Sequence, residues 1–139
     1  MLTLRPAAPA DLDGCARVYV AAAAIAFPWV EPEERGERQF QESVRGEAVW
    51  LAEGPKGIVG IVSIYLPNRF LHSLYVQPAC QRRGIGRGLV DLALHHCGGH
   101  AHLKCHEANR EACRFYLATG WQPAGWGWSP EGPWIRFSR

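Results

Sequence analysis

Hydrophobic and polar positions follow two spacings along the chain, and these predict alternating helices and strands. Stretches with apolar residues three or four positions apart predict helices at 11–24, 33–44, 84–97 and 109–119. Shorter runs rich in β-branched and aromatic residues predict strands at 2–5, 48–52, 58–66, 70–76, 101–106, 121–128 and 134–137. The helix at 33–44 is expected to be charged and exposed. This order predicts a mixed α/β (α+β) fold, in which helices cover a central sheet.

Residues typical of turns and helix ends separate the predicted elements. Glu53-Gly54-Pro55-Lys56-Gly57 has the composition of a tight turn, so the strands on either side are expected to form a hairpin. Gly98-Gly99 is expected to end the third helix, and Asn109 is expected to cap the fourth. The chain has 139 residues, the usual size of one domain, so we expect a single domain over residues 1–139.

The overall charge argues against two broad classes of partner. The chain carries 15 Lys and Arg residues against 13 Asp and Glu residues, a net charge of +2. This is too small for a protein that coats nucleic acid or a membrane surface, so neither partner is expected. The five cysteines show no Cys-x-x-Cys spacing, and the start of the chain lacks the apolar core of a secretory signal. Both observations favour reduced thiols and a cytoplasmic location.

One loop combines glycine and arginine in a way that suits an anion. It follows the strand at 70–76 and runs into the first turn of the helix at 84–97. Its sequence is Gln81-Arg82-Arg83-Gly84-Ile85-Gly86-Arg87. The start of a helix offers unpaired N–H groups, and glycines allow an anion to approach closely. The loop therefore predicts a pyrophosphate site, with a solvated basic turn as the alternative. It has neither the Lys-Ser/Thr pair of a P-loop nor the G-x-G-x-x-G spacing of a dinucleotide site.

A second motif lies downstream of this loop. It is Asn109-x-x-Ala112-x-x-Phe115-Tyr116-x-x-x-Gly120-Trp121, and the loop itself follows Leu74-Tyr75-Val76 and Pro78. Together the two motifs resemble the acetyl-coenzyme A motifs of the GCN5-related N-acetyltransferases (GNAT family), which usually have Phe where this chain has Trp121. The resemblance implies a mainly antiparallel mixed sheet of about seven strands with a splayed parallel pair, flanked by about four helices.

The resemblance also implies where acetyl-coenzyme A binds. The cofactor would lie between two parallel strands that splay apart, at 70–76 and 101–106. Backbone groups near Leu74 and Val76 would pair with its pantetheine arm, and the helix start would hold its pyrophosphate. The residues carried over to this cofactor site are Leu74, Tyr75, Val76, Gln81, Arg82, Arg83, Gly84, Ile85, Gly86, Arg87, Asn109, Phe115 and Tyr116.

The implied reaction is direct transfer of the acetyl group from the thioester to a neutral amine. Tyr116 is the candidate general acid, because a phenol of pKa about 10 is protonated at neutral pH; a packed helix aromatic is the alternative. His72 is the candidate base, since strand parity places it with Leu74 and Val76; a histidine held elsewhere on the sheet is the alternative. Glu107 is a second candidate base, and a backbone N–H near Leu74 is the expected oxyanion donor.

Two groups of residues remain as candidate contacts of the acceptor or of a metal. Phe27 and Trp29 lie between the first two helices, where the family builds its acceptor pocket, and the acidic residues at 31–34 favour a cationic amine. The run at 95–106 is rich in His and Cys, but Gly98-Gly99 interrupts it and no zinc-module spacing results. No metal is therefore expected. The C-terminal tryptophans are expected mainly to fill the core and edges of the sheet: Trp121, Trp126, Trp128 and Trp134.

The leading interpretation is an acetyl-coenzyme A-dependent N-acetyltransferase that acts on a primary amine in the cytoplasm. The sequence does not select between a small molecule and a peptide or protein as the acceptor. One alternative is a non-catalytic acyl-coenzyme A-binding module that regulates a partner. A nucleic-acid binder that uses the arginine cluster is the weakest interpretation, because a net charge of +2 attracts phosphate poorly. Since many relatives dimerise, a homodimer is a further expectation.

Overall fold

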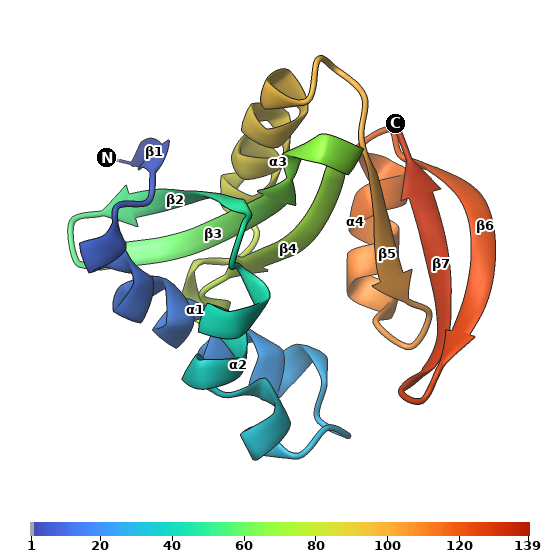
Figure 1. Cartoon of the computed structure of the whole chain (residues 1–139), viewed down its shortest axis with the longest axis horizontal. Helices are drawn as coiled ribbons and strands as arrows, with labels where there is room; N and C mark the ends of the chain where they lie inside the picture. The colour runs from blue at the N-terminus through green and yellow to red at the C-terminus, as the bar shows by residue number, and fades with distance from the viewer. Residues whose placement is uncertain (1) are drawn as a thin grey trace.

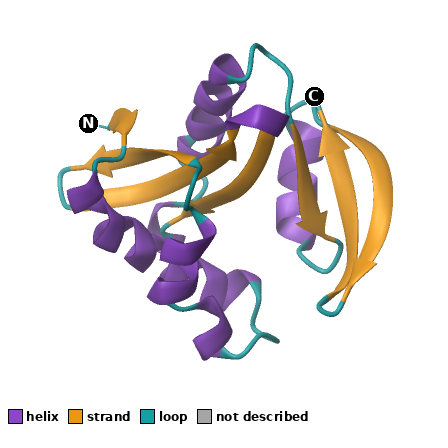
Figure 2. Cartoon of the chain, viewed as in Figure 1, coloured by secondary structure: helices purple, strands orange, loops and turns teal. Residues whose placement is uncertain are grey.

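The computed structural model describes residues 2–139 as one seven-stranded mixed sheet with helices on both faces (Figure 1 and Figure 2). Its strands, in the sheet order β1-β2-β3-β4-β5-β7-β6, are β1 (Thr3–Pro6), β2 (Ala48–Gly54), β3 (Gly57–Tyr65), β4 (Phe70–Val76), β5 (His102–His106), β7 (Gly132–Ser138) and β6 (Gln122–Ser129). The α-helices are α1 (Leu12–Ala26), α2 (Glu37–Ser43), α3 (Ile85–His96) and α4 (Arg110–Ala118). Within the described range, every helix is too short or too polar to span a bilayer.

The fold class expected from the sequence is confirmed. β2 and β3 pair antiparallel on either side of the predicted turn. Asn109 caps α4, because its side chain accepts a hydrogen bond from the N–H of Ala112 at 3.3 Å. α3 ends before Gly98 and Gly99, whose positive φ angles of 73° and 90° suit glycine. The turn, the helix cap and the helix end are predictable from the sequence because each depends on residues close together in the chain.

The predicted helix at 33–44 is wrong in two respects. Gly36 has an extended backbone (φ −89°, ψ 178°), and it divides this segment into the 3₁₀ turn η2 (Pro32–Arg35) and the short helix α2. The segment is not wholly exposed either, because Phe40 is fully buried and packs against Tyr19 of α1, with ring centroids 5.3 Å apart. One apolar residue among many charges is a weak signal, so only the tertiary packing reveals this buried contact.

β4 and β5 form the only parallel pair among the described strands, and they separate soon after they meet. Their one paired position joins Phe70 to His102. Beyond it, β4 stays paired with β3 as far as Val76, whereas β5 pairs with β7 on its other side. The two strands diverge in Figure 1. The edge of β4 that faces β5 therefore has no strand partner from Leu71 to Val76.

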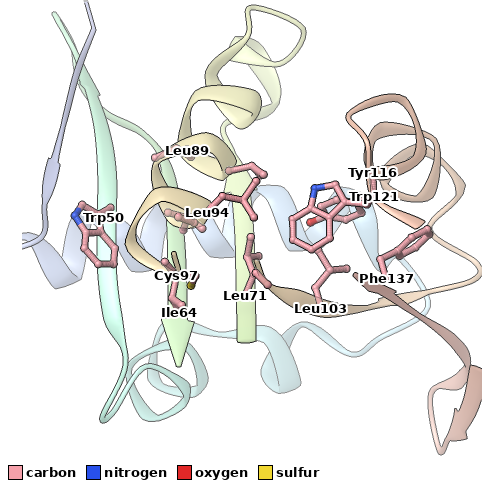
Figure 3. Close-up of a cluster of buried hydrophobic side chains, with 14 of the residues drawn as sticks. Trp50, Ile64, Leu71, Leu89, Leu94, Cys97, Leu103, Tyr116, Trp121 and Phe137 are labelled. Atoms are coloured by element: carbon pink, nitrogen blue, oxygen red, sulfur yellow. The ribbon is translucent and has the colours of Figure 1, made fainter. Parts of the chain in front are cut away.

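Two hydrophobic clusters, one on each face of the sheet, hold the helices in place. The cluster beneath α3 and α4 includes Leu71, Leu89 and Trp121 (Figure 3). The cluster beneath α1 and α2 includes Phe40 and Ile61. Both faces of the sheet are thus covered around β3 and β4, and the divergence of β4 and β5 leaves an opening beside this part of the sheet.

The C-terminal tryptophans divide between the core and the edge of the sheet, as expected. Trp121 is 1% exposed, and Trp134 is half-buried on β7. Trp126 and Trp128 are 68% and 77% exposed on β6, the edge strand. A second chain can pair with an exposed edge strand. The β6 edge is therefore the surface at which the predicted homodimer would form.

The packing of α3 on β3 leaves no room for a side chain at Gly60. A Cβ built there would lie 3.0 Å from Cγ2 of Ile85 and 3.0 Å from Cδ1 of Leu89. We expect Gly60→Val to lower the free energy of unfolding by about 1–3 kcal/mol, the usual effect of overpacking a core. Urea denaturation measures the difference. Gly125→Val is the matched control, because a Cβ there would meet nothing within 4 Å; equal stability of the two variants would contradict the prediction.

Candidate functional site

A cavity of about 550 Å³ lies where β4 and β5 diverge. Its walls come from the end of α1, the unpaired edge of β4, the loop before α3 and the start of α4. The predicted site residues in these walls are Trp29, Leu74, Tyr75, Val76, Gln81, Arg82, Gly84, Ile85, Gly86, Arg87, Asn109, Phe115 and Tyr116. Phe27, His72 and Arg83 are not among the lining residues. The fold thus brings the two sequence motifs together around one space.

The loop before α3 has the geometry of an anion site. Arg82 and Gly84 take left-handed conformations, with φ angles of 65° and 79°, and these turn the chain sharply into the helix. Nε2 of Gln81 donates to the carbonyl oxygen of Val76 at 3.2 Å, which ties the loop to the end of β4. No side chain caps α3. The N–H groups of its first turn are therefore available to an anion.

Three arginine side chains line the same cavity: Arg82, Arg87 and Arg110. Arg110 was not expected from the sequence, although its place directly after the capping Asn109 was an available signal. Glu111 also lines the cavity, 3.9 Å from Arg82. Both side chains of that pair are largely exposed, so the contact offsets little of the positive charge. The net charge of this wall favours a phosphate-bearing ligand.

α4 contributes a polar group at its start and aromatic groups further along. Because the Asn109 oxygen caps the helix, the amide N–H groups of that side chain remain as donors for a ligand. Tyr116 is 7% exposed and packs edge-on against Phe115 and Trp121, with centroids 5.2 and 5.8 Å away. Burial raises the pKa of Tyr116 well above its ordinary value of 10.0, so the phenol is protonated at neutral pH. Tyr116 is thus both a packed aromatic and part of the cavity wall.

The prediction that strand parity turns His72 toward the cavity is wrong. The β3–β4 ladder shifts register between Ser63 and Ile64, which leaves His72 as the extra residue of a β-bulge and breaks the alternation. Nδ1 of His72 instead lies 2.7 Å from Oε2 of Glu47, just before β2. Glu107, the second candidate base, lines a different hollow between α4 and β7. Neither candidate base is in the wall of the cavity that Tyr116 lines.

The two candidate acceptor contacts have different positions. Trp29 lines the cavity and is 47% exposed. Phe27 is 8% exposed and lies behind Trp29, with the two rings edge to face at 5.6 Å. The guanidinium of Arg35 lies 4.5 Å from the centre of the Phe27 ring, and the His106 ring lies 5.5 Å away. Phe27 therefore supports Trp29 from behind, and the expectation that it lines the acceptor pocket is corrected.

An ionic cluster that the sequence did not indicate joins η2 to the turn between β6 and β7. Nη2 of Arg35 donates to Oε2 of Glu131 at 2.5 Å, and Nε2 of His106 lies 3.4 Å from the same oxygen. Burial raises the pKa of Tyr75, which lies near Arg35 and Glu131 and lines the cavity, so its hydroxyl is neutral. The members of this cluster are far apart in the chain, so no local pattern reveals them.

The histidine- and cysteine-rich run at 95–106 is divided among separate structural contacts. His96 stacks on Trp50, with ring centroids 4.4 Å apart. The Sγ atoms of Cys105 and Cys113 lie 3.6 Å apart as free thiols. Within residues 2–139, no three His, Cys, Asp or Glu side chains are arranged to hold a metal ion.

Comparison with known sequences connects this geometry to a family. Residues 14–121 match the acetyltransferase (GNAT) family. The chain is also 33% identical over 82 residues to the peptidyl-lysine N-acetyltransferase YiaC of Escherichia coli strain K12. That match covers 59% of this chain and 55% of the relative, so the chain spans about half the length of the curated relative that it matches.

Comparison with solved structures extends the likeness to nearly the whole chain. A GCN5-related N-acetyltransferase from Rhodopseudomonas palustris has a TM-score of 0.81 at 19% identity, covering 99% of this chain and 94% of that one. The PaiA N-acetyltransferase of Thermoplasma acidophilum, solved in complex with coenzyme A, has a TM-score of 0.79 at 15% identity and coverage of 98% of both chains. At these identities the likeness shows a shared fold.

Proposed function

The chain belongs to the acetyltransferase (GNAT) family, and from this premise we propose that it transfers the acetyl group of acetyl-coenzyme A directly to a primary amine. The observation that carries the proposal is the meeting of three features around one cavity. These are the unpaired edge of β4, the uncapped start of α3 and the buried phenol of Tyr116. The first suits an extended amide arm, the second suits an anion, and the third is a proton donor.

The cavity walls fit the parts of acetyl-coenzyme A. The amide groups of the pantetheine arm would bind the backbone of Leu74 and Val76 as a neighbouring strand does. The pyrophosphate would bind the first turn of α3 and the arginines around it. A Cβ at Gly86 would lie 3.7 Å from the Phe115 ring and 3.8 Å from Val76. Any longer side chain at Gly86 would therefore fill the space between α3 and α4.

Tyr116 is the general acid of the proposed transfer. A neutral amine attacks the thioester carbonyl carbon, the C–S bond breaks, and the leaving thiolate takes the proton of the Tyr116 hydroxyl. A backbone N–H near Leu74 is the proposed donor to the oxyanion that forms during the attack. The proposal assigns no side chain as the base, because neither His72 nor Glu107 lines the cavity. The amine proton passes to solvent, and the Tyr116 phenolate regains a proton from solvent, which completes the cycle.

Turnover with a panel of amines tests the proposal. Release of free thiol from acetyl-coenzyme A is measured with a lysine peptide, a free peptide N-terminus, a polyamine and an amino acid. The lysine peptide comes first because the E. coli relative is a peptidyl-lysine N-acetyltransferase. Amine-dependent release of thiol is the expected result. Tight binding of coenzyme A without turnover of any amine would instead support the regulatory acyl-coenzyme A-binding module.

The proposed partners are acetyl-coenzyme A and an amine acceptor, without a metal, nucleic acid or membrane. The net charge of +2 supports the absence of a polyanionic partner. The five free cysteines support a cytoplasmic location. We also propose a homodimer through the exposed edge of β6, where Trp126 and Trp128 lie, and light scattering in solution tests it.

Trp29 is the proposed contact of the acceptor amine, because an exposed indole face in the cavity wall attracts a cation. We expect Trp29→Ala to raise the KM for the amine about fivefold, which corresponds to about 1 kcal/mol. The KM for acetyl-coenzyme A stays unchanged. Tyr65→Ala removes an exposed aromatic side chain that is not among the cavity-lining residues and is the control. Equal amine KM values for the two variants would rule out the contact.

A further inference from the structure

Lys104 of β5 and Arg136 of β7 lie directly opposite each other in the antiparallel ladder. Like charges in this position destabilise a sheet. Both residues are exposed, and neither forms a salt bridge within residues 2–139. Arg5, by contrast, pairs with both Asp11 and Glu53. The fold thus keeps two uncompensated cations side by side at a position where a sheet disfavours them.

An aromatic side chain holds Lys104 in position. Its Nζ lies 4.6 Å from the centroid of the Trp134 ring. Trp134 in turn occupies the space above Gly127 of β6, where a Cβ would come within 2.0 Å of the ring. A cation–π contact orients the ammonium group without neutralising it. Lys104 is therefore a placed charge at the surface, still able to bind an anion.

These two cations lie on the face of the sheet from which an acceptor enters. Leu103 and Phe137 are buried beneath α3 and α4, so by strand alternation Lys104 and Arg136 point to the opposite face. The α3–α4 side of the opening holds the proposed cofactor loop and Tyr116. The amine would then approach from the α1–α2 face. β5 lies across the opening from β4 (Figure 1).

Other charged groups lie on this face, among them Glu33 and Glu34 of η2, but within residues 2–139 none forms a salt bridge with Lys104 or Arg136. Arg35 and His106 both contact one carboxylate, that of Glu131. Glu131 is thus already engaged, and Lys104 and Arg136 remain as a separate basic pair one pleat further along β5 and β7. Lys104 and Arg136 thus add two positive charges to this face, on β5 beside the opening and on β7 behind it, outside the residues that line the cavity.

We propose that Lys104 and Arg136 bind a carboxylate that neighbours the acetylated amine of the acceptor. A guanidinium beside an ammonium binds a carboxylate through charge-assisted hydrogen bonds. The acceptor class is then an amine with an adjacent acid, supplied either by an acidic peptide or by a free amino acid. This inference rests on the proposed acetyltransferase function and narrows its substrate.

Two peptides that differ only beside the acceptor lysine test the proposal. One has the sequence Gly-Asp-Lys-Asp-Gly and the other Gly-Asn-Lys-Asn-Gly, both blocked at their ends. We expect the wild-type protein to favour the Asp peptide about fivefold in kcat/KM, through KM, since two partly exposed ion pairs supply an effect of this size. The double variant Lys104→Gln/Arg136→Gln loses the preference. Lys56→Gln/Arg45→Gln, which removes one exposed Lys and one exposed Arg elsewhere, keeps it.

A second arm identifies the source of the carboxylate, and a binding measurement separates this inference from the proposed function. A free amino acid is compared with its amide; a preference for the acid in this arm indicates a small-molecule acceptor. Equal kcat/KM values for the two peptides and also for the amino acid and its amide overturn the site, as does a preference that survives in Lys104→Gln/Arg136→Gln.

If no amine is acetylated, calorimetry measures the affinity of each peptide for the coenzyme A complex of the protein. Equal affinity for both peptides overturns the inference. Thermal melting shows whether the double variant is folded under the assay conditions.

Discussion

Tyr116→Phe is expected to lower kcat by about 100-fold, the lower end of the contribution of a positioned general acid. The variant keeps the ring that packs against Phe115 and Trp121, so the fold and the affinity for coenzyme A remain. Only the hydroxyl that donates to the leaving thiolate is lost. Steady-state kinetics with the best amine, together with calorimetry of coenzyme A binding, separates the two effects. Tyr65→Phe removes an exposed hydroxyl on β3 and is the control.

The pH dependence of kcat gives an independent test of the same role. An acid acts while it is protonated, and burial raises the pKa of Tyr116 above its ordinary value of 10.0. Activity therefore shows no decline from ionisation of this phenol as the pH rises from 7 to about 10. A loss of kcat below threefold in Tyr116→Phe would mean that the thiolate takes its proton from water or another group.

Arg82→Ala/Arg87→Ala is expected to raise the KM for acetyl-coenzyme A about 30-fold, or about 2 kcal/mol, as two charge-assisted contacts to a pyrophosphate are lost. Both side chains line the cavity around the uncapped start of α3. The effect should weaken at high salt, which screens exposed charges. Acetylpantetheine, which lacks the pyrophosphate, is the diagnostic substrate. Its KM should be the same in wild type and in the double variant.

Arg83→Ala is the matched control for this pair. Arg83 belongs to the same sequence motif, but the structure leaves it outside the cavity wall. We expect the KM of this variant for acetyl-coenzyme A to be close to that of wild type. A large effect of Arg83→Ala, or an equal loss of acetylpantetheine turnover in Arg82→Ala/Arg87→Ala, would place the pyrophosphate elsewhere.

The cofactor half of the site was predictable from the sequence because its determinants are local. The glycines and arginines of the loop, the Asn109 cap and the aromatic residues of α4 each act within a few residues of their neighbours. Their two motifs then predicted one shared cavity through resemblance to a family. Twelve of the thirteen residues predicted for the cofactor site line that cavity, and Arg83 does not.

The acceptor half was predictable only in part: Trp29 lines the cavity, but the other predictions fail, each for a physical cause. A one-residue bulge in β4 removed His72 from the face that parity assigned to it. Phe27 is predicted from the sequence to contact the acceptor, and the segment at 33–44 that holds Phe40 is predicted to be exposed. Both side chains are instead buried in the cluster beneath α1 and α2. Whether a side chain in such a segment faces solvent or core depends on which element packs over it, and this information lies elsewhere in the chain.

The sequence by itself determined the order of helices and strands, the anion loop and the family to which these motifs point. Only the tertiary structure decided that Arg35 pairs with Glu131, and that Lys104 stands opposite Arg136 beside the opening. The two groups of features differ in how far apart their residues lie along the chain. Caps, turns and helix starts depend on hydrogen bonds between near neighbours in the chain, whereas the charge that surrounds an acceptor depends on strand register and on loops that meet across the sheet.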